Sequence, residues 1–444
     1  MTMKTRTKKL LIAIFSLIIF LSAANMASAQ YLWNDTTAFK AGEANSGRLW
    51  GYTFGDFAYK GHSDSLNRGG SNQYTGIPQS RTTFQFRRIY LGYDYNISKK
   101  FSAELLLAAE DNFPAGNPPS SSAASGDELL NNKLSFYIKL ANVRWKNIWK
   151  GTDLIVGQIG TPAFPALSEK VWSYRSIERT VADIRRTPSY DMGASLQGVF
   201  DPATKNVGYN LMVANGSSAK PESDNFKWFY GDIYAYLFQK HIVLDLYADY
   251  ERLNWTSSWH HSRSMVKGFI AWNSSATAKT MNPGTGYTIG VEGFVNNLKN
   301  DLVAAKISGG NDTLTNAASA ISMYIHGDIV PGKLRFFARL DLFNPMNKVD
   351  NTTYTGYKGN TGNYNDNSYT LSGSTYTATG DETYKQTFVT AGLDFKPAPR
   401  VHFMPNIWYN SYKSQIGGNN QGHDVVYRIT FFYAFGKNYD NGGF

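Results

Sequence analysis

The chain has 444 residues, no cysteine, 42% hydrophobic residues and a formal net charge of +10. Without cysteine it cannot be a disulfide-stabilised exported domain or a lipoprotein anchored through a cysteine after its leader. The positive excess is mild: removing the four bases of the first 29 residues lowers it from +10 to +6. No nucleic-acid partner is expected, because an exported protein would rarely meet one.

The first 29 residues have the pattern of a secretory signal peptide. Four basic residues between positions 4 and 9 precede an apolar run over 10–24, and Ala27-Ser28-Ala29 supplies small residues before Gln30. The alternative is a membrane anchor, but the run is shorter than the ~20 residues a spanning helix needs. We therefore predict cleavage after Ala29, export, a short periplasmic segment over 30–48 and a transmembrane barrel over 49–444.

From residue 49 onward, apolar and polar side chains alternate with the period of a β-strand. Most of the alternating segments reach the 9 to 11 residues that a tilted strand needs to cross a bilayer. Sixteen strands are predicted, at 49–60, 83–96, 101–110, 133–146, 152–160, 189–199, 206–214, 227–238, 241–253, 264–273, 285–295, 316–328, 333–343, 386–396, 400–412 and 423–435.

The connections distinguish a membrane barrel from a soluble sandwich, because both folds show alternating strands. Short turns follow most even-numbered strands, whereas longer polar loops follow the odd-numbered ones, the longest over 344–384. This asymmetry is typical of outer-membrane barrels, and an even count places both termini in the periplasm. Two segments disagree with the scheme: 274–284 is a long turn on the short side, and 296–315 could hold an extra strand. The count therefore stays open between 14 and 18.

The loop over 161–188 differs from the other loops because its spacing is compatible with a helix. At 100° per residue, four apolar side chains share one stripe, and Arg175, Arg179 and Arg186 lie nearly opposite. We predict that this loop folds into the lumen and points its arginines at the pore. The alternative is a solvated outer helix whose arginines pair with nearby acids: Glu169, Glu178 and Asp183.

Other basic residues fall on the predicted inner face of the strands. They are Arg335 and Arg339, with Arg88, Lys139 and Arg428 as weaker candidates. Guanidinium groups bind phosphate or carboxylate through paired donors, so these residues are candidate anion-binding groups. The alternative is that they pair across the wall with inward acids: Glu104, Asp245, Asp249, Asp341 and Asp394.

Nothing in the sequence indicates catalysis. The seven histidines show no metal-ligand spacing, and no nucleophile-elbow, zinc-protease, P-loop or dinucleotide motif is present. We therefore predict no enzyme activity, no cofactor and no metal site.

Several segments, in order along the chain, resemble the family of phosphate-selective porins O and P. They are residues 87–92 (RRIYLG), 157–162 (GQIGTP), 174–179 (YRSIER) and 338–341 (ARLD), the last followed by Pro345. The resemblance implies a sixteen-stranded, usually trimeric porin in which basic residues line an anion pathway. The phosphate-contacting residues of the family have no unambiguous match here.

The predicted fold is all-β: a transmembrane antiparallel β-barrel of about 16 strands, with long outer loops and one loop folded into the lumen. Such a barrel would contact lipid and lipopolysaccharide in a Gram-negative outer membrane and would be inserted by the barrel-assembly machinery. The predicted function is passive diffusion of small hydrophilic solutes through a homotrimer, with a mild preference for phosphate-like anions. The alternative is a barrel that binds or adheres through its long loops, especially 344–384.

Overall fold

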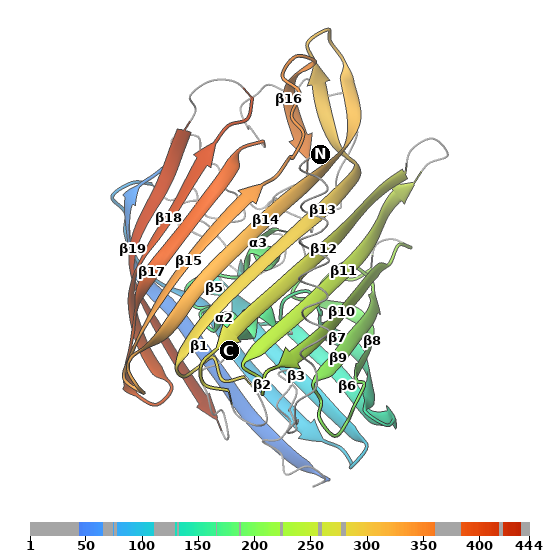
Figure 1. The fold of residues 1–444 in the computed structure, drawn as a ribbon, viewed down its shortest axis with the longest axis vertical. Helices are drawn as coiled ribbons and strands as arrows, with labels where there is room; N and C mark the ends of the chain where they lie inside the picture. The colour runs from blue at the N-terminus through green and yellow to red at the C-terminus, as the bar shows by residue number, and fades with distance from the viewer. Residues whose placement is uncertain are drawn as a thin grey trace.

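In the computed structural model, sixteen antiparallel strands close into a barrel (Figure 1). The predicted signal peptide and Arg186 lie outside the described residues. The structure describes residues 44–64, 74, 78–110, 129–130, 133–165, 167–185, 188–222, 225–255, 260–276, 281–359, 383–416 and 421–436.

Each predicted strand corresponds to one strand of the wall, so the sixteen-strand prediction is confirmed. The wall strands are β1 (Ser46–His62), β2 (Thr82–Asn96), β3 (Phe101–Glu110), β6 (Tyr137–Trp149), β7 (Thr152–Gly160), β8 (Tyr190–Val199), β9 (Val207–Ala214), β10 (Trp228–Leu237), β11 (Ile242–Trp255), β12 (His260–Asn273), β13 (Tyr287–Lys306), β14 (Asn311–Val330), β15 (Leu334–Asn344), β17 (Lys385–Ala398), β18 (Val401–Lys413) and β19 (Gln421–Gly436). A small separate hairpin joins β4 (Leu129–Leu130) to β5 (Lys133–Leu134).

The first and last strands complete the barrel. β1 pairs with β2 on one side and with β19 on the other, the latter from Trp50 opposite Gly436 to His62 opposite Val425. Closure gives every wall strand two neighbours, so backbone hydrogen-bonding groups are satisfied within the sheet. This is what a strand in a hydrocarbon environment requires.

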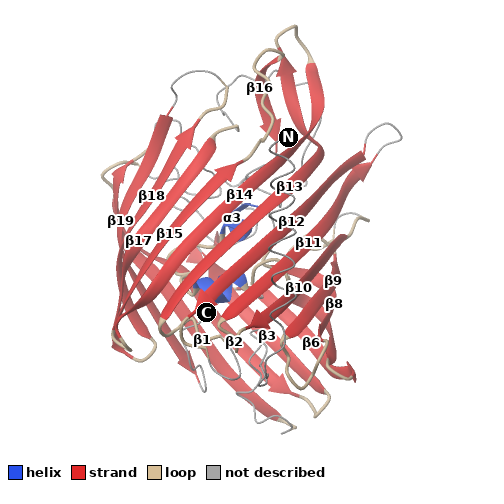
Figure 2. Ribbon diagram, in the orientation of Figure 1, coloured by secondary structure: helices blue, strands red, loops and turns tan. Residues whose placement is uncertain are grey.

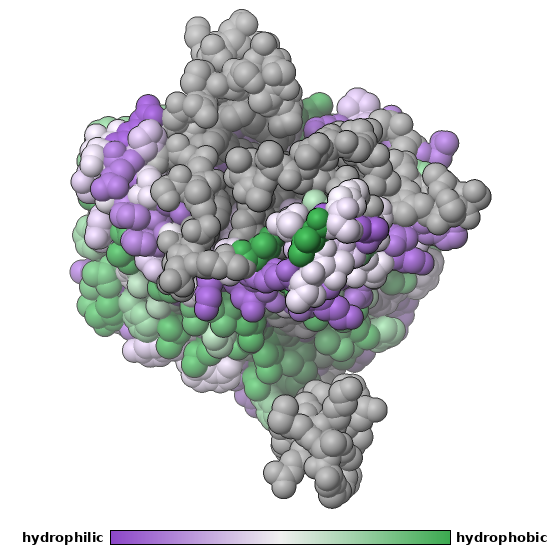
Figure 3. Space-filling view, turned by 90° about the horizontal axis from the view of Figure 1, so that it is seen from above, coloured by the Kyte–Doolittle hydropathy of each residue, from purple (hydrophilic) through white to green (hydrophobic). Residues whose placement is uncertain are grey.

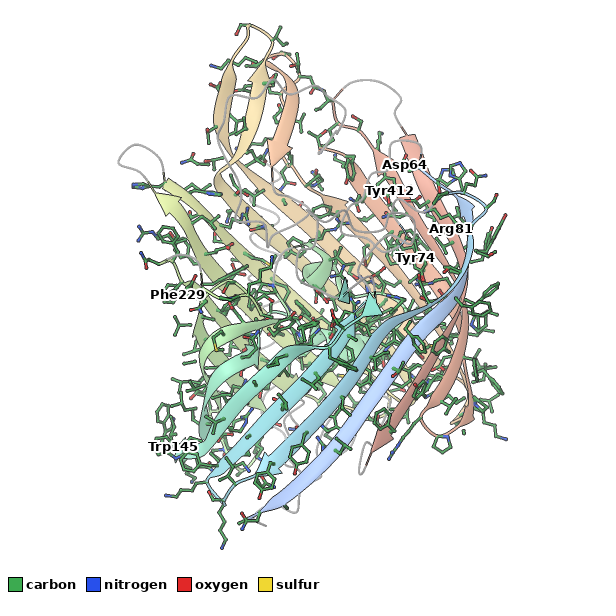
Figure 4. All side chains as sticks on the ribbon, turned by 180° about the vertical axis from the view of Figure 1, so that it is seen from behind. Asp64, Tyr74, Arg81, Trp145, Phe229 and Tyr412 are labelled. Carbon is green, nitrogen blue, oxygen red and sulfur yellow. The ribbon has the colours of Figure 1, made fainter. Side chains whose placement is uncertain are left out.

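The two faces of the wall differ as predicted. On β15, Arg335, Phe337, Arg339 and Asp341 are buried inside, while Leu342 is 41% exposed on the outside. Apolar side chains gather along the outer flank in Figure 3, and Trp145 and Phe229 project outward in Figure 4. Exposed aromatic residues lie near both ends of the strands, as in the girdles of membrane barrels. Examples are Phe101, Trp145, Trp149, Phe395 and Tyr433 at the turn side, and Phe84, Phe136, Phe229, Tyr250 and Tyr427 at the loop side.

The ambiguous segment 296–315 is the tip of one long hairpin and holds no extra wall strand. β13 and β14 each run for 20 residues and rise above the rest of the barrel (Figure 1). The short strand β16 (Tyr354–Gly359) pairs with the end of β13, so the hairpin becomes a three-stranded extension. Gly309 and Gly310 form the tip with φ values of 92° and 82°, a conformation that favours glycine.

The long turn on the short-turn side, predicted at 274–284, runs to residue 286 before β13 begins. Its second half packs against the inner wall, where the Arg335 Nη2 donates to Pro283 O at 2.9 Å. The Gly286 amide donates to Asp328 Oδ2 at 2.5 Å. Its length is therefore explained by a fold back onto the lumen side of β14 and β15.

The loop after β7 lies inside the barrel, as predicted, but it is not one amphipathic helix. It forms two five-residue helices, α2 (Ser168–Trp172) and α3 (Val181–Arg185), shown inside the barrel in Figure 2. α2 stops at Ser173, which has a left-handed φ of 63°. Within the described residues, no helix has the length and apolar character needed to cross a bilayer.

Candidate functional site

Three arginines of the wall hold the backbone of the inward loop between α2 and α3. We name them the arginine clamp; they come from β15, β19 and β2, which lie within the run of neighbouring strands β15, β17, β18, β19, β1 and β2. The contacts are Arg87 Nη1 to Ser176 O at 2.9 Å, Arg428 Nη2 to Ile177 O at 3.0 Å and Arg339 Nη1 to Arg179 O at 2.7 Å. Charged donors make these hydrogen bonds stronger than neutral ones. The clamp therefore replaces the intrahelical bonds that a continuous helix would have made.

Side chains of the loop add further anchors to the same wall. Trp408 Nε1 of β18 donates to Glu178 Oε2 at 2.9 Å. The Trp172 ring packs against Tyr324 of β14 with centroids 5.0 Å apart. On the neighbouring strand, Phe337 packs against Tyr174 of the loop at 4.6 Å. The loop thus crosses from β7 and β8 and is fixed to the wall around β13 to β19 and β2.

A second group of basic side chains lies at the inner face of β2, β3 and β6; Arg88 is on β2 and Lys139 is on β6. Arg88 Nε lies 3.4 Å from Glu110 Oε2, and Lys139 forms an ion pair with the same carboxylate. The Tyr90 hydroxyl donates to Glu110 Oε1 at 2.6 Å. The Lys139 ammonium also lies 4.9 Å from the centroid of the Tyr190 ring, within cation–π range.

The loop contributes two arginines to this group. Arg175 pairs with Glu169 and, at 2.8 Å, with Asp183, and it lies near enough to Glu110 to interact with it electrostatically. Arg179 lies 3.5 Å from Asp183, and its side chain is 22% exposed. We name Arg88, Lys139, Arg175 and Arg179 the basic cluster.

The structure separates the predicted site residues into three groups. Four form the basic cluster, where the loop meets the wall of β2, β3 and β6. Arg339 and Arg428 belong to the clamp, and Arg335 holds the long turn while also pairing with Asp328 at 2.8 Å. Arg175 and Arg179 pair with acids, as the alternative prediction of a solvated outer helix expected. The loop itself lies inside the barrel, as the first prediction expected. Neither prediction expected two short helices in place of one.

Sequence reasoning missed Arg87 as a lumen residue. Arg87 and Arg88 are adjacent, yet both are buried inside, at 3% and 2% exposure. The pairing of β1 with β2 shifts register at this point: Phe54 is opposite Arg88 and Gly55 is opposite Phe86. A β-bulge of this kind inserts one residue and turns two neighbouring side chains to the same face. The only sign of this bulge in the sequence is the occurrence of two arginines in succession.

No protein-family model matches the chain, and no curated protein matches it. Solved structures do match over most of its length. The outer-membrane channel DcaP of Acinetobacter baumannii is 11% identical, with 88% of this chain and 98% of that chain covered and a TM-score of 0.55.

Two further structures have similar scores. An anion-selective porin from Comamonas acidovorans is 9% identical, with coverage of 88% and 100% and a TM-score of 0.51. OmpT of Vibrio cholerae lacking loop L8 is 11% identical, with coverage of 88% and 100% and a TM-score of 0.50. At these identities the likeness shows a shared barrel fold.

Proposed function

We propose that the chain is an outer-membrane channel of a Gram-negative bacterium through which small hydrophilic solutes diffuse passively. The carrying observation is the closed barrel whose outer face is apolar and girdled by aromatic residues, while its inner face is charged. Lipid outside and water inside require this division. The likeness to DcaP, described as an outer-membrane channel, supports the proposal.

The basic cluster supports a mild preference for anions. It places four bases against three acids, Glu110, Glu169 and Asp183, so the local excess is a single positive charge. Arginine and lysine side chains at a narrow passage raise the local anion concentration. Carboxylates and phosphate are the proposed solutes, in keeping with the resemblance to phosphate-selective porins O and P. A homotrimer inserted by the barrel-assembly machinery is part of the same proposal.

Single-channel recording in planar bilayers tests both statements. The purified protein should give stable conductance steps, and its reversal potential in a KCl gradient should favour chloride modestly. Arg175→Gln with Arg179→Gln should shift the reversal potential toward cations. The shift should grow at low salt, because the Debye length of about 8 Å at physiological ionic strength lengthens as salt is diluted.

The matched control removes two bases outside the lumen, with Lys227→Gln and Lys299→Gln. This variant should keep the wild-type reversal potential. Equal reversal potentials in wild type and the Arg175/Arg179 variant at both salt concentrations would remove the anion preference. An absence of conductance steps in folded wild-type protein would instead favour surface binding, for which the three-stranded extension of β13, β14 and β16 is the available platform.

A further inference from the structure

We propose that the lumen face of β10 to β13 carries a subsite for the ammonium group of a solute. The subsite consists of Asp232 on β10, Asp245 on β11 and Glu292 on β13, with Lys267 of β12 between the last two. We name these four residues the acid row. The inference rests on the proposed function as a channel.

β10, β11, β12 and β13 are neighbouring strands (Figure 1). Their register places the acid row in one band across them. Asp232 is opposite Tyr247, two residues from Asp245, and Lys267 is likewise opposite Tyr247. Glu292 is opposite Phe269, two residues from Lys267. Diagonal neighbours at this spacing are within reach of long side chains.

The row has fewer donors than its carboxylate oxygens need. Asp232 Oδ1 accepts from Asn210 Nδ2 at 2.7 Å, and Asp245 Oδ2 accepts from Lys267 Nζ at 2.9 Å. Glu292 Oε1 accepts from the Ala182 amide of the inward loop at 3.3 Å, and Glu292 Oε2 lies 3.9 Å from the Lys267 ammonium. Among the described residues, Asp232 Oδ2 and Asp245 Oδ1 have no hydrogen-bond partner, although both residues are at least 95% buried.

Two tyrosine hydroxyls beside the row are a separate observation, because a hydroxyl can both donate and accept a hydrogen bond. Tyr236 and Tyr324 are buried, and within the described part of the chain their hydroxyls form no hydrogen bond. Tyr236 interacts electrostatically with Asp245, and Tyr324 does so with Glu292. Because a buried polar atom without a partner is costly, these oxygens indicate that a further hydrogen-bonding group is accommodated beside the row.

The charge of the row and the surroundings of Lys267 both favour an ammonium group as that further partner. Three carboxylates face one lysine within the row, so the formal charge of the row itself is −2. Arg339 is a further base that lies near enough to Glu292 to interact with it electrostatically. Lys267 shows what environment the row offers to a cation: its ammonium lies 5.8 Å from the centroid of Tyr247 and 5.9 Å from that of Phe269. Carboxylates beside aromatic rings suit an alkylammonium ion.

A metal ion is less suited to the row. The described part of the chain holds no group of three or more acidic, histidine or cysteine side chains that could ligate a metal. The acids are instead spread along the band, as recognition of an extended organic cation would require.

Block of the channel by n-butylammonium chloride tests the subsite. The added ion should reduce the single-channel KCl current of wild-type protein in a saturable way. Asp232→Asn with Glu292→Gln should weaken this block about tenfold or more, because two charge-assisted contacts are lost. The same variant should move the reversal potential toward anions, opposite to the Arg175/Arg179 variant.

The matched control neutralises two other lumen acids with Glu104→Gln and Asp153→Asn, and its block should stay within twofold of wild type. Current that butylammonium does not reduce, or reduces equally in wild type and the Asp232/Glu292 variant, would overturn the subsite while leaving the channel intact. Folding is checked by heat-modifiable electrophoretic mobility, and Asp232→Asn alone serves if the double variant does not fold.

Calorimetric titration of detergent-solubilised, folded protein with butylammonium separates the subsite from the channel. If no conductance is seen but binding is measured and is lost in the Asp232/Glu292 variant, the proposed function fails and the subsite stands. If no binding is measured, or binding is equal in the variant, the subsite fails as well.

Discussion

At the scale of single residues, the partner of each arginine decides its role. Residues 176–179 form no regular helix, so their carbonyls need donors from elsewhere in a poorly hydrated place. Arg87, Arg339 and Arg428 supply them from three strands. An arginine can serve a carbonyl and a second acceptor together, as Arg339 does with Asp341 at 2.8 Å through its Nε.

The clamp predicts that the loop can be loosened without removing any charged side chain of the basic cluster. Arg339→Gln with Arg428→Gln removes charge-assisted contacts of about 1.5 to 3 kcal/mol each. Residues 176–179 should then move away from the wall, and single-channel recordings should show larger current fluctuations and altered conductance. Arg144→Gln is the control, because it removes a guanidinium inside the barrel that bonds to Asp153 and Gln197 of the wall and not to the loop. A double variant with wild-type noise and conductance would show that the clamp does not position the loop.

Alternation predicted which way these side chains point, but not what they touch. Arg88, Lys139, Arg335, Arg339 and Arg428 are all buried inside, as predicted. Facing is a local property of a strand, because successive side chains point to opposite sides. Contact with residues 176–179 depends instead on the path of a loop that starts more than 100 residues before Arg339. For that reason the sequence left anion binding and charge pairing as equal alternatives.

At the scale of elements, the strands and the inward position of the loop were predictable, but the internal structure of the loop was not. Each strand repeats a two-residue pattern over 8 to 20 residues, so the pattern averages out exceptions. The spacing over 167–186 was compatible with one helix, but Ser173 and the clamp impose a turn between two short helices. Tertiary contacts therefore override the local helical preference.

Gly290 of β13 leaves room for an aromatic ring that packs on this loop. A Cβ atom on Gly290 of β13 would lie 2.2 Å from Cζ of Tyr324, the ring that packs on Trp172. We expect Gly290→Ala to displace Tyr324 and lower stability by about 1 to 3 kcal/mol, as overpacking does. Urea titration of the heat-modifiable band measures the change. Gly268→Ala, whose Cβ would meet only Leu246 at 3.9 Å, should be nearly neutral, and equal midpoints for both variants would refute the packing argument.

At the scale of the whole molecule, the barrel depends on the seam between its first and last strands. Lys60 of β1 and Asp424 of β19 form a buried ion pair at 2.6 Å across this seam. The Lys60 ammonium also donates to Tyr74 O at 2.7 Å, and the Tyr412 hydroxyl donates to Asp424 Oδ2 at 2.8 Å. Asp64, Tyr74 and Tyr412 gather at this end of the seam in Figure 4. Residues distant in sequence thereby close the cylinder.

Asp424→Asn should therefore weaken closure, because it leaves the Lys60 ammonium buried beside a neutral group. Breaking a buried pair costs about 3 to 5 kcal/mol, whereas removing both charges costs much less. Adding Lys60→Met to Asp424→Asn should restore part of the lost stability, read as the temperature at which the heat-modifiable band shifts. Asp312→Asn, which breaks the partly exposed Lys306–Asp312 pair on the extension, should cost only about 0 to 1 kcal/mol. If Lys60→Met instead lowers the stability of the Asp424→Asn variant further, the argument from an unpaired buried charge is wrong. The backbone pairing of β1 with β19 would then be what holds the first and last strands together.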